Sequence, residues 1–168
     1  TDQLTVSFAG TYLDNEYSKF PNAPCWASSA DPIRGDCQLF GTPDAYRDAS
    51  GETNSFSPEY AFNLNLDYRQ PLTGDLEGRA VLNINYSDDY MVAADLDPIY
   101  AYQEAYTKYD VRLSVGQIDG EWEFAVIGKN LTEEFSGGNS NDQPLVPGNG
   151  FASTDRLRSY MAQFTYRF

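Results

Sequence analysis

The stretch Tyr60–Arg69, YAFNLNLDYR, decides the fold class, because apolar and polar side chains alternate along its whole length. In an extended chain its Tyr, Phe and Leu side chains lie on one face, and its Asn, Asp and Arg side chains lie on the other. The apolar face begins at Tyr60 and ends at Tyr68, with aliphatic residues near its middle. In barrel strands that cross a membrane, aromatic side chains occupy the two ends of the apolar face, near the lipid headgroups. The stretch therefore predicts a β-strand whose apolar face suits lipid.

Alternation of the same kind recurs along the chain. We predict six strands, over Leu4–Leu13, Pro58–Gln70, Arg79–Ser87, Tyr106–Ile118, Glu121–Leu131 and Arg156–Phe168. The polar faces of these segments are rich in Asn, Ser and Thr and carry charges. In a membrane barrel such a face would line the lumen. The pattern predicts an all-β, antiparallel fold.

The dipeptide Asp119-Gly120 sets a strand register. It lies between two predicted strands and has the composition of a two-residue type I′ hairpin turn. The pairs that follow from this turn are Leu113 with Val126, Val115 with Phe124, and Asp110 with Lys129. Apolar residues thus face apolar residues and an acid faces a base, which supports the register.

Charge is unevenly distributed along the chain. Of 25 acidic and 11 basic residues, 16 acids and three bases lie in three long connections, 14–57, 88–105 and 132–155. These connections carry −13 of the net charge of −14. The other two connections, 71–78 and 119–120, are short. Long and short connections alternate in this way in outer-membrane barrels, where the short turns are periplasmic.

Composition excludes several functional classes. The net charge of −14 and the lack of a basic stripe argue against a nucleic-acid partner. The chain has no His and only two Cys, which rules out His-based nucleophilic catalysis and the usual zinc sites. No apolar run approaches the roughly 18 residues of a membrane-spanning helix. We expect no enzyme activity and no cofactor.

Cys25 and Cys37 are the only cysteines, and they lie in a segment rich in Pro, Ser, Asp and Gly. We predict a disulfide between them, formed in an oxidising compartment. Two free thiols in a cytosolic loop are the alternative.

The acidic connections are most simply a solvated surface. A vestibule that attracts cations, or a bridge to lipopolysaccharide through divalent ions, is the alternative. Ca²⁺ would be bound by carboxylates such as those of Asp88, Asp89, Asp95 and Asp97. Because these residues lack the regular ligand spacing of an EF-hand, no metal site is predicted.

Four stretches carry a family resemblance: Gly10–Cys25, Ser57–Tyr68, Trp122–Thr132 and Phe164–Phe168. With them the chain resembles the C-terminal end of the β-barrel of TonB-dependent outer-membrane receptors. The resemblance implies that residues 1–168 form the last six strands of a 22-stranded barrel. On this interpretation the plug domain, the TonB box and the signal peptide are absent from this chain.

The resemblance also implies a function. A receptor of this kind resides in the bacterial outer membrane and takes up a scarce ligand, such as a siderophore, cobalamin or an oligosaccharide, with energy supplied by the TonB complex. Its implied partners are lipid and lipopolysaccharide, the rest of the barrel with its plug, and the barrel-assembly machinery. That machinery would read the C-terminal aromatic residues, which are Tyr160, Phe164, Tyr166 and Phe168.

Two sets of residues are candidates for contact with a ligand or with the rest of the receptor. The candidates on the long loops are Trp26, Tyr46, Tyr100, Tyr102, Phe135 and Asn149. Aromatic side chains among them could stack on a sugar or an aromatic siderophore. The candidate lumen charges, expected to pair with one another or with the plug, are Asp67, Arg69, Asp110, Arg112, Lys129 and Arg167.

Two other interpretations fit the alternation. A small structural or adhesive outer-membrane barrel would act through its loops and would need at least eight strands. A secreted all-β carbohydrate-binding module would line a sugar groove with its aromatic side chains and would dissolve in water without detergent.

Overall fold

The computed structural model describes residues 2–25, 37–39, 42–93, 96, 101–142 and 150–168. These residues form only β-strands, turns and loops. No helix among them is long and apolar enough to cross a membrane. The prediction of an all-β fold with antiparallel pairing is confirmed.

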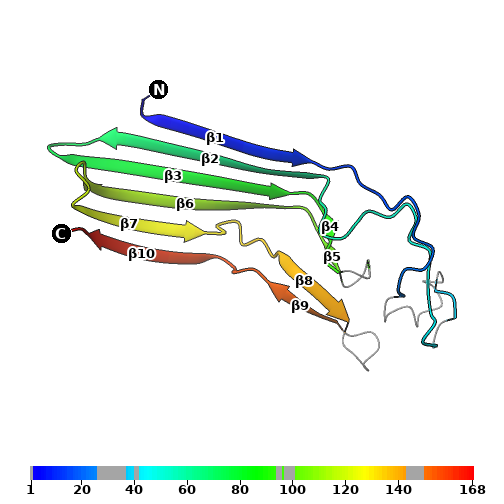
Figure 1. Ribbon diagram of the computed structural model, residues 1–168. Helices are drawn as coiled ribbons and strands as arrows, with labels where there is room; N and C mark the ends of the chain where they lie inside the picture. The colour runs from blue at the N-terminus through cyan, green and yellow to red at the C-terminus, as the bar shows by residue number, and fades with distance from the viewer. Residues whose placement is uncertain (1, 26–36, 40–41, 94–95, 97–100, 143–149) are drawn as a thin grey trace.

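One sheet of six strands dominates the structure. Its strands are β1 (Leu4–Tyr12), β2 (Tyr60–Pro71), β3 (Leu76–Ser87), β6 (Tyr106–Gln117), β7 (Trp122–Lys129) and β10 (Ser159–Tyr166). They follow the order β1-β2-β3-β6-β7-β10, and each pairs antiparallel with its neighbours. The short turns and both chain ends lie at one end of the sheet, and the long loops lie at the other (Figure 1). The six predicted strands are therefore present, in chain order.

Two small hairpins lie in the long connections. They consist of β4 (Tyr90–Met91) with β5 (Tyr102–Gln103), and β8 (Gly137–Asp142) with β9 (Gly150–Thr154). Neither hairpin joins the large sheet. Within the described part of the connection from β1 to β2, only isolated bridges form, between Ala23 and Arg47 and between Gln38 and Tyr46.

The register of β6 and β7 is the predicted one. The observed pairs include Leu113 with Val126 and Val115 with Phe124. Just beyond this ladder, the Nζ atom of Lys129 lies 2.8 Å from Oδ2 of Asp110. Both the apolar pairs and the ion pair that the sequence predicted are therefore present.

The turn that sets this register is not type I′, and that prediction is wrong. Type I′ needs positive φ at both central residues, but of Asp119 and Gly120 only Gly120 has it, at 79°. The Gly120 N–H donates to the Gln117 carbonyl over 2.9 Å. This bond, with the left-handed glycine at the fourth position, fits a type I turn, where Gly is favoured at that place. The loop is longer than two residues, yet it preserves the register.

Several predicted strand limits also need correction, among them those of β10, which spans Ser159–Tyr166 rather than Arg156–Phe168. β3 begins at Leu76 rather than Arg79, because Leu72 donates its N–H to the Leu76 carbonyl over 2.8 Å and extends the hairpin through the polar turn segment. β7 ends at Lys129 rather than Leu131, because Asn130 leaves the strand with a φ of 49°.

Asn130 is held in this conformation by hydrogen bonds. Its backbone N–H donates to Oδ1 of Asp110 over 2.8 Å, and its Nδ2 donates to the Glu134 carbonyl, also over 2.8 Å. Its Oδ1 accepts from the Glu134 N–H over 3.0 Å. Asn tolerates the left-handed region better than most residues, so this position suits it.

The apolar face of the sheet is not covered by any described part of the chain. Phe8 is 68% exposed and Phe164 is 66% exposed. The buried apolar residues among those described are Ala23, Ala49, Val92, Ala93, Leu96, Ala101 and Ala125. Of these only Ala125 belongs to the large sheet, so this sheet has no hydrophobic core of its own.

Aromatic rings gather near both ends of that face. Towards the loops, Tyr12 lies 5.1 Å from Tyr60 and Phe62 stacks on Tyr86 at 4.9 Å, measured between ring centroids. Towards the short turns, Tyr166 and Phe168 pair at 5.2 Å, just outside Phe164. Aliphatic residues of β2 and β3 occupy the middle.

Gly116 in β6 permits a close approach between strands. A Cβ atom at this position would lie 2.5 Å from the Trp122 carbonyl oxygen and 3.1 Å from Cα of Glu123. We predict that Gly116→Ala lowers the free energy of unfolding by about 1–3 kcal/mol through overpacking, as measured by urea unfolding. In the control Gly78→Ala, the nearest atom would be 3.5 Å from the new Cβ, so no loss is expected. Equal stability of the two variants would contradict the prediction.

Candidate functional site: the polar face and the outer loops

Charged side chains on the polar face of the sheet pair with one another. Arg79 donates to both carboxylate oxygens of Asp67, from Nε over 2.8 Å and from Nη2 over 2.6 Å. Arg69 approaches the same carboxylate at 3.6 Å. This bidentate geometry makes the Arg79–Asp67 pair the stronger of the two.

The remaining predicted lumen charges also have partners. Arg112 forms an ion pair with Glu123 and donates to Oε1 of Gln163 over 3.0 Å. Arg167 donates from Nη1 to the Gly120 carbonyl over 2.7 Å. With the Asp110–Lys129 pair, all six charges have partners within the chain. Arg79 and Glu123 were not singled out from the sequence, although both lie on polar positions of the alternation.

Amide side chains form a second cluster on the same face, nearer the loops. Nδ2 of Asn63 donates to Oδ1 of Asn83 over 3.2 Å and to Oδ1 of Asn85 over 2.6 Å. These residues come from the paired strands β2 and β3. The polar face therefore has an arginine-rich region near the short turns and an amide-rich region near the loops.

The two outer hairpins are joined to each other. Ser140 of β8 donates its backbone N–H to the Val92 carbonyl over 2.9 Å. Gly137 donates its N–H to Oε1 of Gln103 in β5 over 2.7 Å, and Nε2 of Gln103 donates to the Phe135 carbonyl over 3.2 Å. The hairpins β4–β5 and β8–β9 thus form one hydrogen-bonded unit beyond the end of the sheet (Figure 1).

Lys108 of β6 connects this unit to the sheet. Its Nζ donates to Oδ2 of Asp155 over 2.9 Å and to Oγ of Ser136, and the Ser136 hydroxyl donates to the same Asp155 oxygen over 2.7 Å. The Lys108 Nζ also lies 5.0 Å from the centroid of the Tyr106 ring. Ser136 is almost fully buried and Lys108 is bound as a cation, so this arrangement is suited to a structural role and not to nucleophilic chemistry.

The structure brings together two of the predicted loop candidates, Tyr102 and Phe135. They line one cavity of about 440 Å³ together with Tyr106, Glu104 and Glu134. Tyr102 also lines a neighbouring cavity of about 430 Å³, whose carboxylates are Glu52, Glu59, Asp88 and Asp89. Neither cavity has a described basic residue in its lining.

The other loop candidates are not brought to these cavities. Tyr46 forms an isolated bridge with Gln38 and lines neither cavity. Trp26, Tyr100 and Asn149 lie outside the described residues.

No group of three or more His, Cys, Asp or Glu residues in the described ranges is arranged to hold a metal ion. Asp88 and Asp89 instead accept hydrogen bonds from tyrosines: Tyr86 donates to Asp88 over 3.3 Å and Tyr102 donates to Asp89 over 2.5 Å. Asp95 and Asp97, the other two residues of the calcium alternative, lie outside the described residues.

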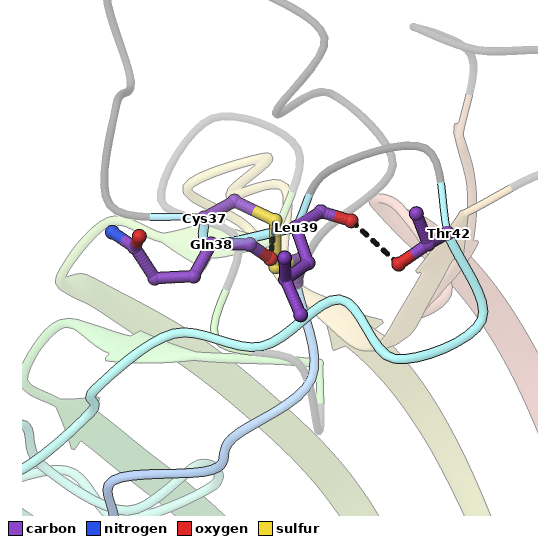
Figure 2. Close-up of a disulfide and its surroundings, with 5 residues drawn as sticks. Cys37, Gln38, Leu39 and Thr42 are labelled. Carbon is purple, nitrogen blue, oxygen red and sulfur yellow. Dashed lines mark hydrogen bonds between the residues drawn. A yellow bond between two sulfur atoms is a disulfide. The ribbon is translucent and has the colours of Figure 1, made fainter.

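The predicted disulfide is present. Cys25 and Cys37 are bonded, with their Cα atoms 5.7 Å apart. Beyond Cys37 the chain turns through Leu39, whose carbonyl accepts a hydrogen bond from the Thr42 hydroxyl over 2.8 Å (Figure 2). The cross-link thus joins the described residues on either side of positions 26–36 in the connection between β1 and β2.

The C-terminal aromatic residues lie on and just after the edge strand β10. Tyr160, Phe164 and Tyr166 alternate along its apolar face, opposite Gly128, Phe124 and Trp122 of β7 respectively. All of them and Phe168 are exposed in the described structure.

Comparisons with known proteins gave no match to a family model, to a curated protein or to a solved structure.

Tyr102 offers a titration test of the loop cavities. Its hydrogen bond to Asp89, together with desolvation, raises its pKa from 10.0 to about 12. Because the folded pKa lies above the unfolded value, this contact contributes stability that is present below pH 10 and is lost as the pH rises through about 12. The difference between the ultraviolet titrations of the wild type and Tyr102→Phe isolates this one phenol. We expect its midpoint near 12, shifted towards 10 in Asp89→Asn; a wild-type midpoint at 10 would contradict the contact.

Asp155 offers a second test, at low pH. The hydrogen bond from Ser136, and after it the Lys108 ammonium, lowers the pKa of this carboxyl. Its contribution to stability is therefore present above the ordinary aspartate pKa and is lost as the pH falls through the lowered value. We predict that hydrogen-exchange protection of β8–β9 falls with acidification in the wild type and is low at all pH values in Asp155→Asn. Asp44→Asn, in the loop between β1 and β2, should behave like the wild type.

Proposed function

We propose that this chain forms part of the wall of an outer-membrane β-barrel that acts as a receptor for energised uptake of a scarce ligand, in the manner of TonB-dependent receptors. One observation carries the proposal: a six-stranded antiparallel sheet has an exposed apolar face with aromatic rings at both ends, while most charged side chains of its other face have ion-pair or hydrogen-bond partners. A water-soluble sheet normally buries its apolar face against another layer.

Strand length supports a membrane environment. The six strands have 8 to 12 residues, close to the roughly 9–11 that a tilted strand needs to cross a bilayer. The rise from Tyr60 to Tyr68 is about 26 Å at 3.3 Å per residue, similar to the apolar band of outer-membrane barrels. Aliphatic residues would then meet the hydrocarbon, and the tyrosines would meet the headgroups.

The free edges of β1 and β10 require a partner in this environment. Unpaired backbone groups cannot be left in hydrocarbon, so both edges must pair with further strands of a closed barrel. We infer that the remainder of the barrel supplies these strands. The polar face would then line the lumen, and the acidic loops with Tyr102 and Phe135 would lie at the outer mouth, where a ligand arrives.

Probe accessibility along β2 tests the membrane orientation. We place a nitroxide at Asn63, Leu64, Asn65 or Leu66, one position at a time, in protein reconstituted into lipid vesicles. The nitroxide is genetically encoded, so no cysteine is needed for labelling and the disulfide stays intact. We predict high accessibility to oxygen at 64 and 66, and to a water-soluble nickel chelate at 63 and 65. Asn139 in the outer hairpin is the water-exposed control. If 64 and 66 were as accessible to nickel as 139, the apolar face would not lie in lipid, and a secreted binding module would be favoured.

Uptake assays test the receptor function itself. Cells that produce this chain together with the rest of the receptor should accumulate one labelled ligand class, siderophore, cobalamin or oligosaccharide, and should stop when a protonophore collapses the proton gradient. Binding of a ligand at the cell surface without accumulation would favour an adhesive barrel instead.

A further inference from the structure

A cavity of about 410 Å³ lies on the polar face of the large sheet, at the end that meets the long loops. It is formed where β1 and β3 end and β2 and β6 begin, and these four strands lie side by side (Figure 1). Its volume is within the range of small-molecule sites. Phe62 and Tyr86 also border it, but their rings stack on each other on the apolar face.

The strand register explains why there is a hollow here. Ala61 lies opposite Thr11 of β1 and opposite Ser87 of β3, and in the next row Asn63 and Asn85 lie opposite each other. Cβ atoms of directly opposite residues are about 5 Å apart and those of diagonal neighbours about 7–8 Å. The side chains around Ala61 can therefore all reach one small molecule that lies over its methyl group.

Asn85 keeps hydrogen-bonding capacity for such a molecule. Its Oδ1 accepts from Nδ2 of Asn63 over 2.6 Å, and its own Nδ2 donates to Oδ1 of Asn83. A primary amide has two N–H donors and two acceptor lone pairs, so one of each remains on Asn85. A free donor beside a free acceptor matches hydroxyl groups, which accept and donate in turn.

The charge of the site is also defined. None of the described residues that line the cavity is charged. Lys108 lies opposite Asn85 outside the lining, but its ammonium is already bound to Asp155 and Ser136. A charged ligand would lose hydration here without gaining a counter-ion, so the cavity favours an uncharged one.

We propose that this cavity binds one pyranose ring of an uncharged sugar. The inference rests on the proposed function and narrows its ligand to a neutral carbohydrate. The C–H face of the ring lies on the methyl groups of Ala9 and Ala61, and adjacent hydroxyl groups bind the amide of Asn85. Tyr106 borders the site on the β6 side and adds an aromatic contact.

Methyl glycosides of glucose, galactose and mannose, each with the methyl glycoside of its uronic acid, are matched probes. Each pair differs only at the sixth carbon, which carries a hydroxyl group in one and a carboxylate in the other. We titrate them into detergent-solubilised receptor, this chain together with the rest of the barrel, and follow binding by saturation-transfer NMR. At least one neutral glycoside should bind, about 10-fold or more tightly than its uronic acid partner, whose carboxylate meets no cation in the cavity.

Two variants locate the binding at this cavity. Ala61→Leu fills the hollow and should weaken binding of the neutral glycoside by about 10-fold or more, because the sugar ring and the new side chain would overlap. Asn85→Ala removes the free donor and acceptor and should weaken binding by about 10-fold. Thr5→Leu places an equally large apolar group on the same face, opposite Asp67 and outside the cavity, so it should bind as the wild type does.

The inference is overturned if none of the neutral glycosides binds, if the uronic acid partners bind as tightly, or if Ala61→Leu or Asn85→Ala binds as well as Thr5→Leu. Retention of the wild-type circular dichroism spectrum excludes misfolding as the cause of a loss. Sugar binding without energised accumulation would reject uptake alone, and accumulation of a charged ligand without sugar binding would reject this inference alone.

Discussion

The rest of the structure depends on one constraint. Apolar and polar side chains alternate along six strands, and these strands pair antiparallel in continuous ladders. Each pair of neighbouring strands is in register over the length of its ladder, so most apolar side chains of one strand meet an apolar neighbour on the next, as Leu66 meets Leu82 and Val115 meets Phe124. A slip of one residue would place Asp67 and Arg79 on the apolar face and expose their charges there. The uncovered apolar face and the paired charges of the polar face are therefore two results of the same register.

The sequence was sufficient to predict the large sheet, because period-two alternation is a local signal that reports which residues share a face. The Asp119-Gly120 dipeptide gave the correct pairing of Asp110 with Lys129 but the wrong turn type, since turn type depends on φ values that composition does not determine. The end of β7 was missed for a similar reason. Asn130 leaves the strand because its backbone N–H binds the carboxylate of Asp110, 20 residues earlier in the chain, and its side chain binds the backbone of Glu134, four residues later.

The loop region was less predictable. The short strands β4, β5, β8 and β9 are too brief to show a period, and they are held by contacts such as Gly137 with Gln103 and Lys108 with Asp155, which join residues far apart in the sequence. Their aromatic side chains made Tyr102 and Phe135 candidates for ligand contact, but the sequence did not predict the carboxylate-lined cavities in which they lie. The Cys25–Cys37 disulfide was predictable, because the chain has only these two cysteines.

The separation of charge along the strands gives the sheet a directional electric field. Acidic residues concentrate in the connections at the loop end, and Arg69, Arg79, Arg112 and Arg167 concentrate near the short turns. The sheet is therefore an electric dipole whose axis follows the strands. Its field draws cations towards the loops and repels anions from them.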